Sequence, residues 1–203
     1  MSIIIPTPPI SGTNELNNTG YTFVAQSFTT SPDSDSILNV QYYAKSNSYR
    51  TDGSGNHIFG GTTYLYYATD NAGVPAVTAT DTGSAMVFTG LNLFAPISKS
   101  YGVGTPTVMS LGTIYSAQNL KLSRNTLYWL IFKVGNAAYE PTGKNTYTHS
   151  VKMGTAADDT QYPGHTAMKM DNTKSPVWTN CNVDVNFIIT MATNSPLPSH
   201  HFS

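Results

Sequence analysis

The histidines of this chain are not spaced as metal ligands. None belongs to an H-x-x-x-H or H-E-x-x-H pattern, in which two imidazoles one helical turn apart hold a zinc ion. The adjacent pair at the C-terminal end lies in a polar tail, where solvated side chains are the usual case. We therefore expect no metal site at the histidines, which are His57, His149, His165, His200 and His201.

One loop has a partial resemblance in spacing to a calcium site. The segment from Asp52 to Asn56, D-G-S-G-N, places oxygen-bearing side chains at alternate positions, as the start of a calcium-binding loop does. The glycine that should follow and the distal bidentate glutamate are both missing. A plain loop is the favoured interpretation, with calcium binding as the alternative, and the sequence predicts no cofactor.

The carboxylates and nucleophiles do not form a catalytic pattern. A glycosidase needs two carboxyl groups about 5–10 Å apart in a cleft, and nothing in the sequence places Glu140 and Asp158 in that way. No G-x-S-x-G motif is present. Cys181 is the single cysteine, so no intramolecular disulfide forms, and without a neighbouring basic cluster we expect a buried, inert thiol. The sequence predicts a protein that is not an enzyme, with a hydrolase as the alternative.

Tyrosine is abundant, with thirteen residues in the chain. Tyrosine and tryptophan rings stack on sugars and also pack at wet protein interfaces. Packing in the core or at an interface is the favoured interpretation for each ring, and a glycan site is the alternative. The aromatic residues that lie in or beside predicted loops are Tyr49, Tyr101, Tyr139, Tyr162 and Trp178.

The overall composition excludes some partners and suggests a setting. Charged residues make up 10% of the chain and the net charge is -1, whereas about 25% is usual. The scattered lysines and arginines argue against nucleic acid and against anionic membranes. No signal peptide and no apolar stretch of membrane-spanning length is visible. A virus particle would reconcile synthesis in a cytoplasm with a surface typical of extracellular proteins.

The residues Leu127 to Phe132 predict the central element, a strand buried on both faces, because six apolar or aromatic residues follow one another there. Asn182 to Thr193 alternates as a strand should. No segment predicts a helix, so the fold class is all-β, a β-sandwich or jelly-roll-like domain. Further strands are expected near 21–30, 37–45, 62–69, 85–89, 108–116, 147–153 and 165–170, and loops at 46–61, 95–106, 138–145 and 156–164.

The two ends of the chain differ from this domain. Residues 1–20 are expected to form an extended, proline-rich N-terminal arm, residues 21–193 the sandwich, and residues 194–203 a polar C-terminal tail. A loose terminus is the bland interpretation of the arm. The functional interpretation is docking in a partner's groove through Ile3, Ile4, Ile5, Pro6, Pro8 and Pro9.

Three motifs in order resemble a known family. They are A-Q-S-F-T at residues 25–29, Y-L-Y-Y-A-T-D-N-A-G-V-P at residues 64–75, and L-K-L-S-R-N-T-L-Y-W-L at residues 120–130. Together they resemble the β-sandwich domains of bacterial surface proteins called choice-of-anchor domains, over residues 21–190. The resemblance implies a jelly-roll-like module displayed outside a cell, without catalytic residues. Those domains usually carry a signal peptide and a C-terminal anchor, and neither is visible in this sequence.

Two functional hypotheses follow. The first is a non-enzymatic structural module of a virus (phage) particle, a capsid decoration (cement) protein or a tail-fibre component that docks on neighbouring subunits of the virion. Homo-oligomerisation, with a trimer as one form, would cover apolar sheet edges. The alternative is a carbohydrate-binding or receptor-recognition module that binds a cell-surface glycan, located in the virion or otherwise extracellular.

Overall fold

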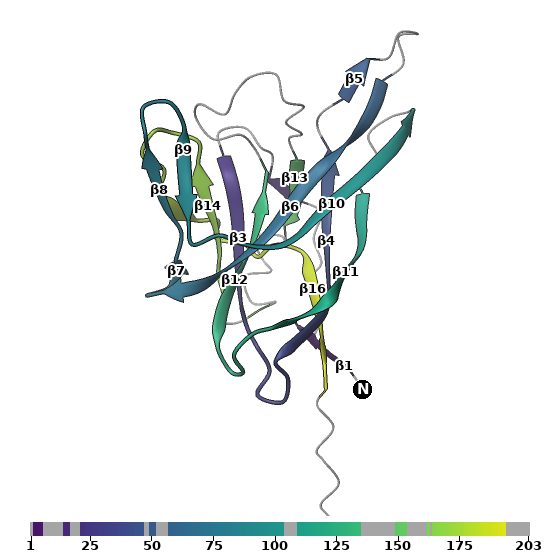
Figure 1. Ribbon diagram of the computed structural model, residues 1–203, viewed down its shortest axis with the longest axis vertical. Helices are drawn as coiled ribbons and strands as arrows, with labels where there is room; N and C mark the ends of the chain where they lie inside the picture. Colours follow the sequence, from purple (N-terminus) through teal and green to yellow (C-terminus); the bar gives the residue numbers. More distant parts are fainter. Residues whose placement is uncertain are drawn as a thin grey trace, which may run out of the picture.

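The computed structural model describes residues 2–5, 14–16, 21–46, 49–51, 57–103, 109–134, 149–153, 162 and 164–193. Within these residues every regular element is a β-strand and every strand pair is antiparallel, which confirms the predicted all-β class. The strands build two larger sheets that pack face to face, with a small hairpin outside them (Figure 1). The expected loop 138–145 and the tail 194–203 lie outside the described residues.

One of the two large sheets, named sheet B, contains the central strand β12. Its strands follow the order β10-β6-β12-β3-β14-β15, and the short strands β5 and β7 also pair with β6. The central strand β12 lies between β3 and β6. The bounds are β3 Tyr21–Thr29, β5 Tyr49–Thr51, β6 His57–Asn71, β7 Val74–Pro75, β10 Asn92–Val103, β12 Leu127–Lys133, β14 Ala167–Asp171 and β15 Trp178–Asn180.

The second large sheet, sheet A, is built around β4. One flank of β4 pairs with β11, and the other flank pairs with β16 and, further along, with β13. The strands β1 and β2 pair in turn with β16 and β13. The bounds are β1 Ser2–Ile5, β2 Asn14–Leu16, β4 Ser36–Ser46, β11 Met109–Lys121, β13 His149–Met153 and β16 Phe187–Ala192.

The main core fills the space between the two sheets. It takes Phe28 and Phe132 from sheet B and Tyr42, Phe187 and Ile189 from sheet A, all of them buried. The rings of Tyr42 and Phe132 meet across the sheets, with their centroids 4.6 Å apart. At roughly 1.5–3 kcal/mol for each buried side chain, this layer supplies most of the apolar stabilisation of the sandwich.

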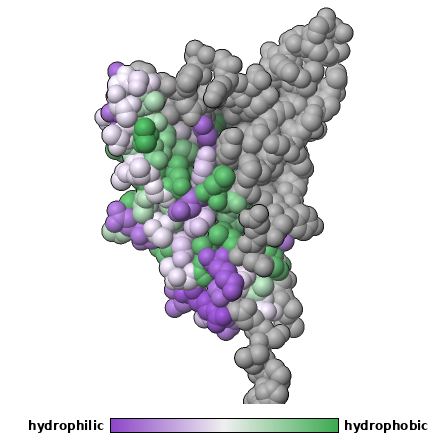
Figure 2. Space-filling model, viewed as in Figure 1, coloured by the Kyte–Doolittle hydropathy of each residue, from purple (hydrophilic) through white to green (hydrophobic). Residues whose placement is uncertain are grey.

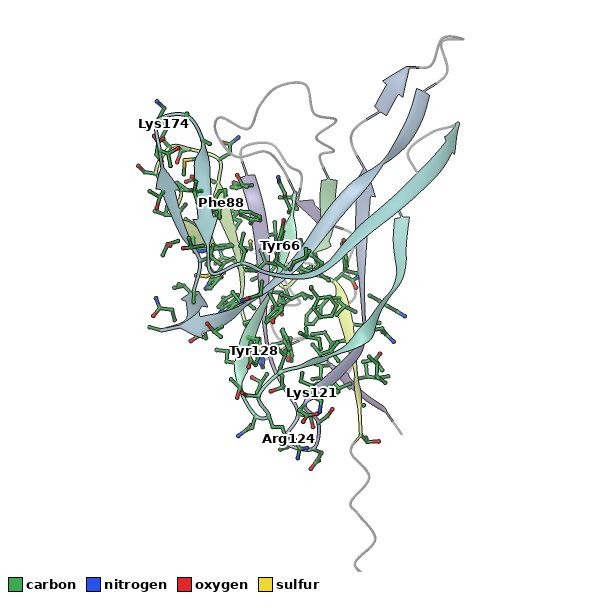
Figure 3. The ribbon with its side chains drawn as sticks, viewed as in Figure 1. Tyr66, Phe88, Lys121, Arg124, Tyr128 and Lys174 are labelled. Atoms are coloured by element: carbon green, nitrogen blue, oxygen red, sulfur yellow. The ribbon has the colours of Figure 1, made fainter. Side chains whose placement is uncertain are left out.

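A second, smaller core lies on the opposite face of sheet B. Trp129 and Ile131 of β12 point there, together with Phe23 of β3, and the hairpin of β8 (Thr78–Asp81) and β9 (Met86–Thr89) covers them. The ring of Phe88 stands edge-on to Phe23, with the centroids 5.0 Å apart (Figure 3). Strand β12 is therefore buried on both faces, as its sequence predicts.

Three predicted boundaries are wrong. The expected loop 46–61 contains β5 and the first part of β6, and the expected loop 95–106 is occupied by β10 up to Val103. Pro96 is accommodated because β10 is an edge strand with a register shift beside it. The expected strand from Asn182 begins only at Phe187, after an isolated bridge at Val185, since the φ of Asn182 is +60° and the N–H of Val185 donates to the Gln26 side chain.

Candidate functional site

The predicted docking arm contains a short strand, β1, that pairs with the edge of sheet A; this edge, Ile189–Ala192 of β16, is called the seat of β1. Strand β1 pairs with the last strand, β16, so that Ile4 lies opposite Thr190 and Ile5 opposite Ile189. Ile5 is 9% exposed and belongs to the main core, whereas Ile4 is 47% exposed on the outer face. This alternation is typical of a strand at the edge of a sheet, with one face toward the core and the other toward solvent. The side chain of Ile3 and the residues Pro6, Pro8 and Pro9 lie outside the described part of the chain.

Strands β1 and β2 occupy the same row of sheet A. Ala44 pairs with Met109 of β11 and also with Val151 of β13, so β13 lies on the flank of β4 that β16 occupies. Because β16 and β13 follow one another along that flank, β1 and β2 follow one another in the next row out. The two short N-terminal strands therefore form one interrupted edge of the sheet.

The outer face beside β1 carries no charged side chain at the described positions. Ile4, Thr190 and Asn39 lie side by side in register across three strands, and Leu38, at a register shift in β4, is 39% exposed. The Oδ1 atom of Asn39 is buried and accepts no hydrogen bond from any of the described residues. Two exposed apolar side chains and a buried carboxamide oxygen thus share one uncharged face next to the edge strand.

Charge gathers elsewhere on the molecule. Arg124 forms an ion pair with Asp35, with Nη2 and Oδ2 3.8 Å apart, at the lower end of the sandwich. Figure 2 shows hydrophobic residues over the middle of the described part of one face and a hydrophilic cluster at its lower end, where Figure 3 places Lys121 and Arg124. Charged and apolar side chains are thus unevenly distributed over the described part of this face.

A buried polar cluster joins the two sheets. Gln26 of β3 is fully buried; its Nε2 donates to Oδ1 of Asp184 at 3.0 Å, and its Oε1 accepts the N–H of Val185 at 2.8 Å. Ser27 beside it bonds twice to the backbone of Thr166, accepting at 2.7 Å and donating at 3.1 Å. These groups bond to one another inside the protein, and the bonds from Gln26 to Asp184 and Val185 tie β3 of sheet B to the segment that leads into β16 of sheet A.

Tyr162, a predicted glycan-stacking residue, lies against this cluster. Its ring is stacked on His165, with the centroids 3.8 Å apart and the planes 3° from parallel, and it is tilted against Phe187. The hydroxyl oxygen accepts the N–H of Thr29 at 3.4 Å, and the Thr29 hydroxyl lies 3.0 Å from Nε2 of His165. Burial raises the pKa of Tyr162 well above 10.0, the nearby Asp184 adds to the rise, and the Thr29 bond opposes it. His165 thus occupies one face of the Tyr162 ring, the kind of surface on which a sugar would stack.

The other predicted aromatic residues are dispersed. Trp178 begins β15 and is half-buried against the second core, and its indole N–H is buried without an acceptor among the described residues. Tyr49 lies in β5 and Tyr101 in β10, with side chains outside the description, and Tyr139 lies outside it entirely. The structure therefore brings none of the described aromatic rings together into a shared stacking platform.

The groups with metal or redox chemistry are also separated. Among the described residues, no three His, Cys, Asp or Glu side chains lie close enough together to hold a metal ion. His57 lies in β6 and His149 in β13, while the Asp52–Asn56 loop and the last two histidines are outside the described residues. Cys181 is half-buried, and desolvation raises the pKa of its thiol to about 11 although Lys169 lowers it.

Sequence reasoning missed Gln26 as the centre of the buried cluster. The available signal was a glutamine inside a strand that is otherwise apolar or hydroxylic, since a buried amide requires partners.

None of the described segments forms a helix that is long and apolar enough to cross a membrane. No protein-family model, no curated protein and no solved structure matches this chain. The functional proposal therefore depends on the fold and on where the side chains lie.

Proposed function

We propose that this protein is a non-enzymatic structural module of a virus (phage) particle, which docks on neighbouring subunits as a capsid decoration (cement) protein or a tail-fibre component. The sandwich supports this role because two sheets around one core make a rigid body for display. The sparse charge and net charge of -1 support protein contacts over contacts with nucleic acid.

The observation that carries the proposal is the position of β1. This four-residue strand is the outermost strand on its flank of sheet A among the described residues, and it carries three consecutive isoleucines and no charge. Natural proteins often protect such edges with lysine, proline, a bulge or very short strand length. Strand β1 is short, but it has no lysine, proline or bulge between Ser2 and Ile5, which supports contact with another protein chain.

The polar groups of the described residues support a structural role as well. Gln26 bonds to Asp184 between the two sheets, and Ser27 bonds to the backbone of Thr166, just before β14 of its own sheet. The Thr29–His165 pair has the distance of a nucleophile and a base. It is nevertheless covered by the ring of Tyr162, which stacks on the imidazole. Such groups stabilise the sandwich and leave its surface for assembly.

The test is incorporation into particles. Virus particles produced with a chain lacking residues 2–12 are purified and probed for the protein, after circular dichroism has established that the shortened chain folds. We expect the shortened chain to be absent from particles. The control is Leu93→Ser, in β10 of the other sheet, which should leave incorporation unchanged. It removes an apolar side chain that is 54% exposed, comparable with the 47% of Ile4. Normal incorporation of the shortened chain would refute the docking role.

A further inference from the structure

We propose that β1 is exchanged between copies of this chain, so that Ser2–Ile5 of one molecule occupies the edge of β16 in a second copy. The inference depends on the proposed function, because it names the partner of the segment to which docking was assigned. The edge of β16 already receives this strand within one chain: Ser2, Ile3, Ile4 and Ile5 pair with Ala192, Met191, Thr190 and Ile189. Every copy carries both the strand and the seat.

The tether that joins β1 to the rest of the chain is longer than its own seat requires. Ile5 is level with Val40 through Ile189, and Leu16 is level with Ala44 through Val151. Four residues along a strand correspond to about 13 Å. Residues 6–13, P-T-P-P-I-S-G-T, are eight residues that can span up to about 28 Å. The excess length allows the strand to reach the sheet of an adjacent molecule.

The composition of the tether favours an extended connection. Three of its eight residues are proline, which fixes φ and removes the N–H that would pair with a neighbouring strand. Proline-rich segments act as semi-rigid spacers.

The energy that holds β1 in place is small enough for exchange. Of its described side chains, only Ile5 enters the core, and the other, Ile4, is largely exposed. The same contacts form again when the strand binds the identical seat in a second copy, so exchange changes the net contact energy little. Reciprocal exchange closes a dimer and cyclic exchange closes a trimer.

A cysteine pair across the β1–β16 register tests the exchange. Ile4 and Thr190 are directly opposite, where cross-strand Cβ atoms are about 4.5–5.5 Å apart, next to the range of about 3.5–4.5 Å that a disulfide takes. Ile4→Cys is placed in one chain and Thr190→Cys in a second, differently tagged chain, both carrying Cys181→Ala, and the two are co-expressed, purified and oxidised. We expect a disulfide-linked mixed dimer that contains both tags on a non-reducing gel. The control replaces Thr190→Cys by Thr89→Cys, an exposed position in β9 of the separate hairpin, and should give no mixed dimer.

The outcomes separate this inference from the proposed function. A single chain that carries Ile4→Cys, Thr190→Cys and Cys181→Ala locks β1 on its own sheet when it oxidises as a monomer. Such locked monomers should fail to enter particles, and reduction should restore entry. If the two singly substituted chains form no mixed dimer, or if locked monomers enter particles normally, exchange is refuted. The proposed function fails instead if chains lacking residues 2–12 are incorporated.

Discussion

The side chain of Gln26 donates a hydrogen bond to the carboxylate of Asp184 at 3.0 Å, deep between the two sheets. Both residues are buried, at 0% and 1% exposure, and the amide oxygen of Gln26 also accepts the N–H of Val185. One glutamine of sheet B thus fixes the entry of the chain into β16 of sheet A. Because β16 is the seat of β1, this tie positions the edge on which docking depends.

Replacing this glutamine should destabilise the protein strongly. Gln26→Leu leaves the carboxylate of Asp184 and the N–H of Val185 buried with fewer partners, and we expect a loss of about 3 kcal/mol in the free energy of unfolding. Urea denaturation followed by tryptophan fluorescence measures the change. The control is Asn92→Leu, at an exposed amide in β10, which should change stability by less than about 0.5 kcal/mol. Equal losses in both variants would show that Gln26 is not a tie between the sheets.

Gly90 should not tolerate a side chain. Its φ is +85°, and a Cβ atom there would clash with the carbonyl oxygen of Ala76, which must move to make room. Gly83 is the matched control, because its φ is +80° and nothing lies within 4 Å of an added Cβ. We expect Gly83→Ala to cost about 1 kcal/mol from backbone strain alone. Gly90→Ala should reduce the free energy of unfolding by clearly more and loosen the hairpin over Phe23. Equal thermal midpoints for the two variants would contradict the close contact between Gly90 and the Ala76 carbonyl.

The stability of the protein should fall in alkaline solution partly because of Tyr162. Its pKa is raised from 10.0 in the folded state, chiefly by burial. The unfolded chain therefore loses the phenolic proton at lower pH than the folded chain, and the unfolded state is favoured as the pH rises above about 10. Tyr162→Phe should remove part of this alkaline loss, measured as the change in thermal midpoint between pH 8 and pH 11. A loss of unchanged size in the variant would exclude Tyr162 as its source.

The thiol of Cys181 should react slowly. Desolvation raises its pKa from 9.0 to about 11, so at pH 8 the thiolate is about 100-fold scarcer than in a free cysteine. Reaction with a disulfide reagent should be slower by that factor in the folded protein and ordinary after denaturation. Lys169→Met should slow it further, since Lys169 lowers the pKa. A folded-state rate equal to that of the denatured chain would contradict the described burial.

Much of the fold could be predicted because burial leaves a direct mark on sequence. The run Leu127–Phe132 predicted a strand covered on both faces, and the second core beneath β8 and β9 explains why its alternate residues are not polar. The strands at Tyr21, Ile37 and Ala167 were also predicted close to their observed positions. Local pattern sufficed where each strand buries its own apolar side chains.

The errors arose where tertiary contacts override local preference. Glycine and proline around Pro96 predicted a loop, but an edge strand tolerates proline because one of its flanks needs no N–H donor. Val183 and Val185 alternate as in a strand, yet the backbone there bonds to the Gln26 side chain from another sheet. The stacking of Tyr162 on His165 depends on a turn whose geometry is not encoded in residue type alone.

The measurement that tests the central claim most directly is the copy number of this chain in purified virus particles from its native source, by quantitative mass spectrometry. We expect the intact chain at a fixed, repeated ratio to the major particle protein, retained through high-salt washing because apolar contacts and backbone pairing are insensitive to ionic strength. Absence from the particles, or trace amounts that salt removes, would contradict the assignment of this protein as a structural module of a virion.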